Sequence, residues 1–164
     1  MPRFDLPFTA GVPITAQTLG VMLAGVVLGP RQGALAVLLF ILVVALGAPL
    51  LAGGRGGLGV FFGPTVGFLI GWVPGVVVTG LAFRALDRFP TAVAAAGASI
   101  LGGILAIYAV GIPVLAWKAG MPLYQAAAAS LAFLPGDLLK AVATGAIAAA
   151  LPASARFGAP PARA

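Results

Sequence analysis

The sequence contains no cysteine, no histidine and no glutamate, and its only acidic residues are three aspartates. Without cysteine, the chain can form no disulfide, thiolate metal site or redox motif. Without histidine and glutamate, metal catalysis and the usual proton relays lose most of their ligands. Neither a Ser/His/Asp nor a Cys/His arrangement for nucleophilic catalysis can be assembled. These absences argue against an enzyme.

Charge of either sign is scarce. Of the 164 residues, only 7% are charged and 62% are hydrophobic, and the mean hydropathy is +1.17. A soluble domain carries roughly 25% charged residues, which it needs for its water-facing surface. The surface of this chain must therefore face a lipid bilayer. We predict an all-α integral membrane protein.

The few charges are mostly basic. Nine Lys and Arg residues against three acidic ones give a net charge of +6 and a pI near 11.3. The basic residues are scattered singly between apolar runs, with no basic patch and no interleaved aromatics, so nucleic acid is not expected as a partner. Their distribution is better interpreted as topology information.

Five apolar segments are long enough to serve as membrane helices, since a bilayer core of ~30 Å needs ~20 helical residues. They lie at about 16–29, 33–51, 64–84, 91–112 and 122–151. Gly-Pro pairs at 29–30 and 63–64 mark helix starts, because proline fits the first helical turn. We expect one compact transmembrane domain over residues 1–164, with a tail at 153–164.

The basic residues predict the orientation of these helices. If the helices alternate in direction, one side carries Arg31, Arg84, Arg88, Arg156 and Arg163, and the other carries Arg3, Arg55 and Lys118. Cytoplasmic loops carry the excess of basic residues, so the first group is predicted to be cytoplasmic. The C-terminus is then inside the cell and the N-terminus outside.

Glycine is abundant, with 24 residues, and small residues in membrane helices allow close packing. The stretches 98–106 ("ASILGGILA") and 141–150 ("AVATGAIAAA") present small residues about four apart. Packing within one bundle is the favoured interpretation. Docking onto a partner membrane protein is the alternative.

The stretch "FLPGDLLKAVATG" (133–145) places an acid and a base in an apolar helix. Asp137 and Lys140 are i and i+3, so they share one helix face and lie about 4.5 Å apart along its axis. Each charge at depth costs ~2.5–3.5 kcal/mol. The pair either neutralises itself and locks helix packing or serves a substrate pathway. Because apolar residues would pack there without that cost, we favour the substrate pathway.

The glycine loop "AGGRGGLG" (52–59) lacks the Gly-Lys-Ser/Thr ending of a phosphate-binding loop, so we reject a nucleotide site. Its flexibility suits a loop that folds over a ligand. Arg55 at its centre either meets an anionic group or is an ordinary surface arginine. Gln17 and Thr15, at the outer end of the first helix, either bind a ligand or cap the helix.

Aromatic residues are interpreted first as structural. Phe68, Trp72, Tyr108 and Trp117 are typical of packing positions or of the aromatic belt at a membrane interface, rather than of stacking platforms.

Three stretches carry a resemblance to a known family: "VPITAQTLGVMLAGVVLGPRQGALAVLLF" (12–40), "GAPLLAGGRGGLGVFFGPTVGFLIGW" (47–72) and "FLPGDLLKA" (133–141). Together they resemble the BioY family, the membrane-embedded, substrate-binding S component of energy-coupling factor (ECF) biotin transporters. The match runs over most of residues 7–145, in the family's order and at its spacing. The resemblance implies a six-helix bundle in the cytoplasmic membrane that captures biotin from outside. Its partners would be a transmembrane T component and two cytoplasmic ATPases.

The resemblance also implies a binding site. In the family, the Asp-x-x-Lys pair of the last helix binds the ureido ring, and positions in the glycine loop contact biotin. The expected substrate-binding residues are Asp137, Lys140, Arg55, Gln17, Thr15, Phe68 and Tyr108. A cyclic urea offers one carbonyl acceptor between two N–H donors, which an ammonium and a carboxylate complement in a dry site. The apolar body of biotin suits a cavity lined by Leu, Val and Phe.

The chain departs from the family in two ways. Relatives often carry Tyr, sometimes followed by a basic residue, where this chain has Phe68 and Leu69, so Arg55 is the candidate for the missing charge. Relatives also carry a helix before the "LPFTAGVPIT" stretch (6–15), so we expect that the first helix of the bundle is missing from the chain as it begins. A solitary small-solute or ion transporter using Asp137, and a structural membrane subunit, are the alternative functions.

Overall fold

The computed structural model describes residues 16–157, and every regular element within that range is helical. The main helices are α1 (Gln17–Ala45), α2 (Val66–Ala85), α3 (Thr91–Ser99), α4 (Ile107–Ala119), α5 (Leu123–Ser130) and α6 (Leu134–Ala150). A π-helical segment, η2 (Ile100–Ala106), and the 3-10 turns η1 (Leu58–Phe61), η3 (Leu131–Phe133) and η4 (Ala153–Ala155) complete them. The predicted all-α class is confirmed.

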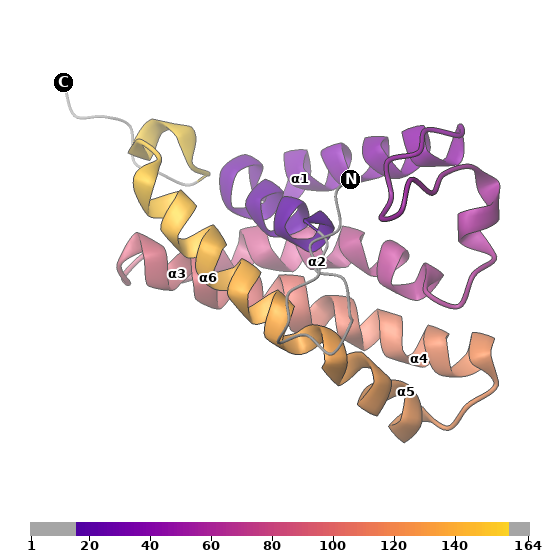
Figure 1. Ribbon diagram of the computed structural model, residues 1–164. Coiled ribbons are helices and arrows are strands. Elements are labelled where there is room, and N and C mark those ends of the chain that lie inside the picture. The colour runs from indigo at the N-terminus through magenta and orange to yellow at the C-terminus, as the bar shows by residue number, and fades with distance from the viewer. Residues whose placement is uncertain (1–15, 158–164) are drawn as a thin grey trace.

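These elements form four apolar helical spans. The segment η2 joins α3 to α4 in the run Thr91–Ala119, and η3 joins α5 to α6 in the run Leu123–Ala150. Together with α1 and α2, these runs are 20 to 29 residues long and apolar enough to cross a membrane. In Figure 1, α2 lies beside α1, and α6 crosses α3. The chain is a multi-pass membrane protein.

The element α1 contains both of the first two predicted helices, because they are joined without a loop. Gly29 has φ +77° and ψ −176°, which breaks the helix just before Pro30. A Cβ placed on Gly33 would lie 2.9 Å from the carbonyl oxygen of Ala24, so the two arms run back along each other. Figure 1 shows this reversal at the end of the first arm. When the two arms of α1 are counted separately, the described residues hold five apolar helical segments, close to the five positions that the sequence predicts.

The C-terminal segment completes the turn of α1. The carbonyl oxygen of Val26 would normally accept a hydrogen bond from the backbone of residue 30, but proline has no N–H. Instead, the N–H of Phe157 donates to it over 3.2 Å. The Phe157 ring occupies the space that a side chain on Gly29 would fill. Residues 153–157, predicted to start a tail, thus pack on the bundle; residues 158–164 lie outside the described residues.

Small residues bring the helices together within the chain. A Cβ on Gly145 of α6 would lie 2.5 Å from the carbonyl oxygen of Ala92 in α3. A Cβ on Gly102 of η2 would collide with Thr79 and the backbone of Gly75 in α2. Both stretches that the sequence analysis singled out, 98–106 and 141–150, therefore pack against other helices of the same bundle.

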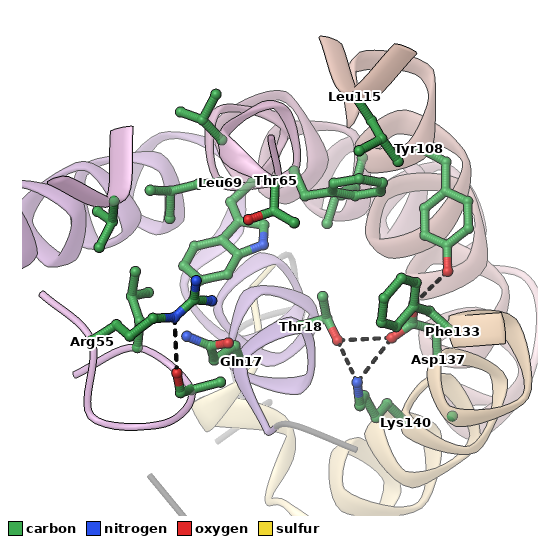
Figure 2. A pocket seen from close by; sticks show the side chains of 18 of the residues that line it. Gln17, Thr18, Arg55, Thr65, Leu69, Tyr108, Leu115, Phe133, Asp137 and Lys140 are labelled. Carbon is green, nitrogen blue, oxygen red and sulfur yellow. Dashed lines mark hydrogen bonds and ion pairs between the residues drawn. The ribbon is translucent and has the colours of Figure 1, made fainter. Parts of the chain in front are cut away.

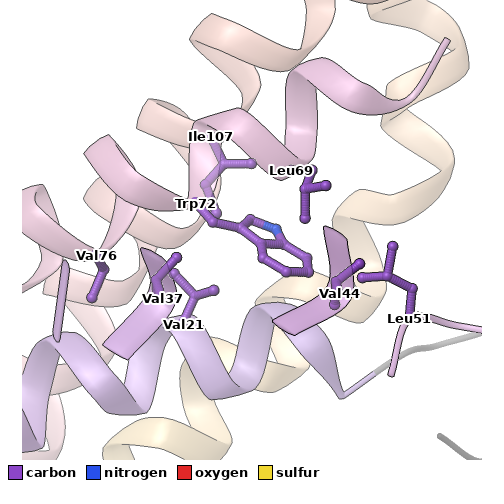
Figure 3. Close-up of a cluster of buried hydrophobic side chains, with 8 residues drawn as sticks. All are labelled: Val21, Val37, Val44, Leu51, Leu69, Trp72, Val76 and Ile107. Atoms are coloured by element: carbon purple, nitrogen blue, oxygen red, sulfur yellow. The ribbon is translucent and has the colours of Figure 1, made fainter. Parts of the chain in front are cut away.

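The hydrophobic core lies between α1, α2 and the start of α4. Its buried members are Val21, Val37, Val44, Leu51, Leu69, Trp72, Val76 and Ile107 (Figure 3). Trp72 is 7% exposed, and its ring lies 5.9 Å from that of Phe40. The packing role predicted for Trp72 is confirmed. The same side chain also forms part of the wall of the cavity described next.

Candidate ligand-binding site

A cavity of about 350 Å³ lies between α1, α2, α4 and the start of α6. The loop that connects α1 to α2 also lines it. Small-molecule sites typically have volumes of about 300–1,000 Å³ and are mostly apolar with a few convergent polar groups. The apolar wall includes Leu51, Val60, Leu69, Trp72, Leu115 and Phe133. The polar lining consists of Gln17, Thr18, Arg55, Thr65, Tyr108, Asp137 and Lys140 (Figure 2).

The ionic pair lies at one side of this cavity. The Lys140 ammonium is 2.9 Å from Oδ1 of Asp137, and their side chains are 11% and 5% exposed. Both residues lie in the first two turns of α6, which has Pro135 at its start. A carboxylate in the first turn is favoured by the unpaired N–H groups and the dipole of the helix. The predicted arrangement on one helix face is confirmed.

Two hydroxyl groups from other helices bind Asp137. Thr18 of α1 donates to Oδ1 over 2.9 Å, and Tyr108 of α4 donates to Oδ2 over 2.8 Å. Lys140 also donates to the Thr18 hydroxyl oxygen over 2.8 Å. Figure 2 shows Thr18, Asp137 and Lys140 as a closed triangle of hydrogen bonds. Three helices therefore meet at a single carboxylate.

Sequence reasoning missed Thr18. It named the neighbouring Gln17 and Thr15, but the partners of Thr18 are 119 and 122 positions away along the chain. The only signal for Thr18 in the sequence is that it is a hydroxyl-bearing residue near the start of an apolar helix. Nothing in that local pattern distinguishes a cap from a tertiary contact. Thr15 itself lies outside the described residues.

Arg55 lies on the other side of the cavity in Figure 2, away from Asp137 and Lys140. A tight turn through Gly53 and Gly54, both with positive φ, presents it. Its Nε donates to the carbonyl oxygen of Ala52 over 3.2 Å, and the side chain is otherwise exposed. Within the part of the chain that the structure describes, the other guanidinium N–H groups of Arg55 have no acceptor, and the ion pair found there joins Asp137 and Lys140.

The other predicted site residues within 16–157 all line the cavity. Gln17 and Phe68 line the cavity with Tyr108, and the Phe68 and Tyr108 rings meet edge to face at 5.8 Å. The Gln17 side-chain nitrogen is buried and finds no hydrogen-bond partner in the described part of the chain. Lys118 and Trp117 lie away from the cavity lining, and the Lys118 ammonium lies 5.6 Å from the centre of the Trp117 ring.

Comparisons with known proteins agree on one family. The model of the BioY family matches residues 1–157. A "Biotin transporter BioY" from Rhodobacter capsulatus is 54% identical over 152 residues, which is 87% of this chain and 80% of that protein. A protein of the same name from Rhizobium etli is 50% identical over 147 residues, covering 87% and 78% of the two chains.

A solved crystal structure shares the fold. It is described as the S-component for biotin from an ECF-type ABC transporter, and it matches with a TM-score of 0.79 and 31% sequence identity. The match covers 92% of this chain and 80% of that chain. The family match, the two relatives and the shared fold lead to one conclusion: the chain belongs to the BioY family.

Proposed function

We propose that this protein is the substrate-binding S component of an ECF biotin transporter and that it binds biotin in the cavity between α1, α4 and α6. It is a transporter subunit and not an enzyme. The observation that carries the proposal is the buried Asp137/Lys140 pair, which faces a mostly apolar cavity of about 350 Å³ in a chain of the BioY family.

The ureido ring of biotin complements the ionic pair. The carboxylate of Asp137 accepts a hydrogen bond from a ring N–H, and the ammonium of Lys140 donates to the ring carbonyl. Hydrogen bonds to charged groups are about twice as strong as neutral ones and gain further in a dry site. Both charged side chains line the cavity, which supports recognition over a purely structural role.

The rest of the ligand suits the rest of the cavity. The bicyclic ring and the valeryl chain are apolar and would pack on Leu69, Trp72 and Phe68. The valerate carboxylate would reach toward Arg55, the cationic side chain at the other side. Gln17 would add a polar contact from the start of α1.

Partners and orientation complete the proposal. Uptake would require a transmembrane T component and two cytoplasmic ATPases, which supply the energy. The protein would lie in the cytoplasmic membrane with its C-terminus inside, as the distribution of its basic residues predicts. The cavity would then open toward the outside, where biotin is captured.

A solitary ion or proton transporter is the less favoured alternative. Such proteins usually place acids on several helices, whereas Asp137 is the buried carboxylate of the described residues and Asp87 lies exposed between α2 and α3. The experiment that decides is direct. The chain is purified in detergent and its biotin affinity is measured by titration calorimetry. Micromolar or tighter binding supports the proposal, and absence of binding by well-folded protein overturns it.

A further inference from the structure

The two hydroxyl groups that bind Asp137 suggest more than a general polar environment. Each donates to a different carboxylate oxygen, Thr18 to Oδ1 and Tyr108 to Oδ2, with distances of 2.9 and 2.8 Å. Thr18 also accepts a hydrogen bond from Lys140. Its hydroxyl thus connects the anion and the cation of the same pair.

Counting hydrogen-bonding groups shows what this arrangement leaves for a ligand. An ionised carboxylate has about four acceptor sites, and an ammonium has three N–H donors. Thr18, Tyr108 and Lys140 each occupy one acceptor site of Asp137. Lys140 donates one N–H to Asp137 and another to Thr18. About one acceptor site on Oδ2 of Asp137 and one N–H donor on Nζ of Lys140 then remain for a ligand.

The same contacts hold these groups in place. Thr18 comes from α1, Tyr108 from α4 and Asp137 from α6, so the carboxylate is bound from two helices besides its own. Without both hydroxyls the carboxylate could rotate and present other acceptor sites. A ligand would then have to order the side chains itself, which reduces affinity.

We propose that Thr18 and Tyr108 are positioning residues: they hold Asp137 and Lys140 with one acceptor site and one N–H directed to the ureido ring. This inference rests on the proposed binding of biotin. It assigns to Thr18 and Tyr108 an action through Asp137, rather than a contact of their own with the ligand.

The first experiment measures biotin affinity by calorimetry for four variants of the full chain. Thr18→Val and Tyr108→Phe each remove one hydroxyl and keep the shape, including the edge-to-face contact of the Tyr108 ring with Phe68. Each should weaken biotin about 10- to 150-fold, the range typical for the loss of one hydrogen bond to a charged group. Thr18→Ser keeps the hydroxyl and should stay within about threefold of the wild type.

Tyr124→Phe is the matched control. Tyr124 is 71% exposed and lies outside the cavity, so loss of its hydroxyl should leave the affinity unchanged. Wild-type affinity in both Thr18→Val and Tyr108→Phe would overturn the inference while the proposed function stands. Equal losses in Thr18→Ser and Thr18→Val would also overturn it, because the hydroxyl would not be the cause.

The second experiment asks whether the hydroxyls act through Asp137. Each substitution is repeated in an Asp137→Asn background, which gives two double-mutant cycles. If Thr18 and Tyr108 position the carboxylate, each should cost less than about twofold once the carboxylate is gone. Undiminished losses in that background would indicate direct contacts with biotin and would overturn the positioning role. A wild type that fails to bind biotin would instead overturn the proposed function, and this inference with it.

Discussion

The position of Arg55 predicts how strongly the protein should prefer biotin, with its valerate carboxylate, over an uncharged ester. If the ureido ring meets Asp137 and Lys140, the valerate carboxylate of biotin extends toward the other side of the cavity, where Arg55 lies (Figure 2). Arg55→Ala should then weaken biotin but hardly affect its methyl ester, which carries no charge at that end. Asp137→Asn should weaken acid and ester alike, since both keep the ureido ring.

The exposure of Arg55 limits the size of this effect. Two unit charges 4 Å apart attract by about 1 kcal/mol in water and about 4 kcal/mol near a protein surface at an effective dielectric constant of 20. Arg55 is exposed, and among residues 16–157 only its Nε makes a hydrogen bond, so the value near the water limit applies. The wild type should therefore prefer the acid to the ester by about 1 kcal/mol, or about fivefold in affinity.

The assay is a cycle of two proteins and two ligands. Wild type and Arg55→Ala are titrated with biotin and with its methyl ester at one ionic strength, and the wild type is titrated again at higher salt. The preference for the acid should disappear in Arg55→Ala and shrink with salt, because the pair is solvated. A preference that survives the substitution unchanged would remove Arg55 from the site. Lys118 would then be the next cation to test.

Three further results are expected. Asp137→Asn and Lys140→Ala should each weaken biotin by about 1.5–3 kcal/mol in calorimetry, as for lost charge-assisted bonds, and wild-type affinity in folded protein would contradict a role in recognition. Phe157→Ala should lower the free energy of unfolding in detergent by about 1–3 kcal/mol without changing biotin affinity, because Phe157 packs against Gly29 and does not line the cavity. Gly145→Leu should destabilise by about 1–3 kcal/mol through overpacking, whereas Gly20→Ala, with open space around it, should have little effect; similar melting of both would refute the close α3–α6 contact.

The features that the sequence could predict are local ones. The ionic pair was predictable because three positions in a helix always bring two side chains to one face. The helices themselves follow from the length of apolar runs. The break at Gly29 was also visible, since a glycine and a proline in succession interrupt a helix. The sequence did not show that the chain reverses at this point without a loop.

The features that could not be predicted depend on distant partners. Pro30 implies that the carbonyl of Val26 lacks its helical donor, but not that Phe157 supplies one. Thr18 and Tyr108 find Asp137 only when α1, α4 and α6 meet. The composition alone favours packing for Tyr108, and it was the family resemblance that added Tyr108 to the expected site. Hydroxyls at such positions bond to water, backbone or side chains with equal ease, so local sequence does not select among these partners.

Recognition and helix association use the same atoms in this protein. In lipid, apolar helix surfaces gain little by meeting each other, so packing and hydrogen bonds between helices carry much of the association. The bonds from Thr18 and Tyr108 to Asp137 are contacts of this kind, and they also hold the carboxylate at the cavity. Biotin bound there would touch groups from α6 while α1 and α4 fix them. Ligand binding should therefore tighten the contact among these three helices, and substitutions at Asp137 should loosen it. Biotin affinity and melting temperature should therefore be measured together for every variant of the site. A fall in affinity at an unchanged melting temperature indicates a loss of recognition. A parallel fall in both indicates that the contacts among α1, α4 and α6 have weakened.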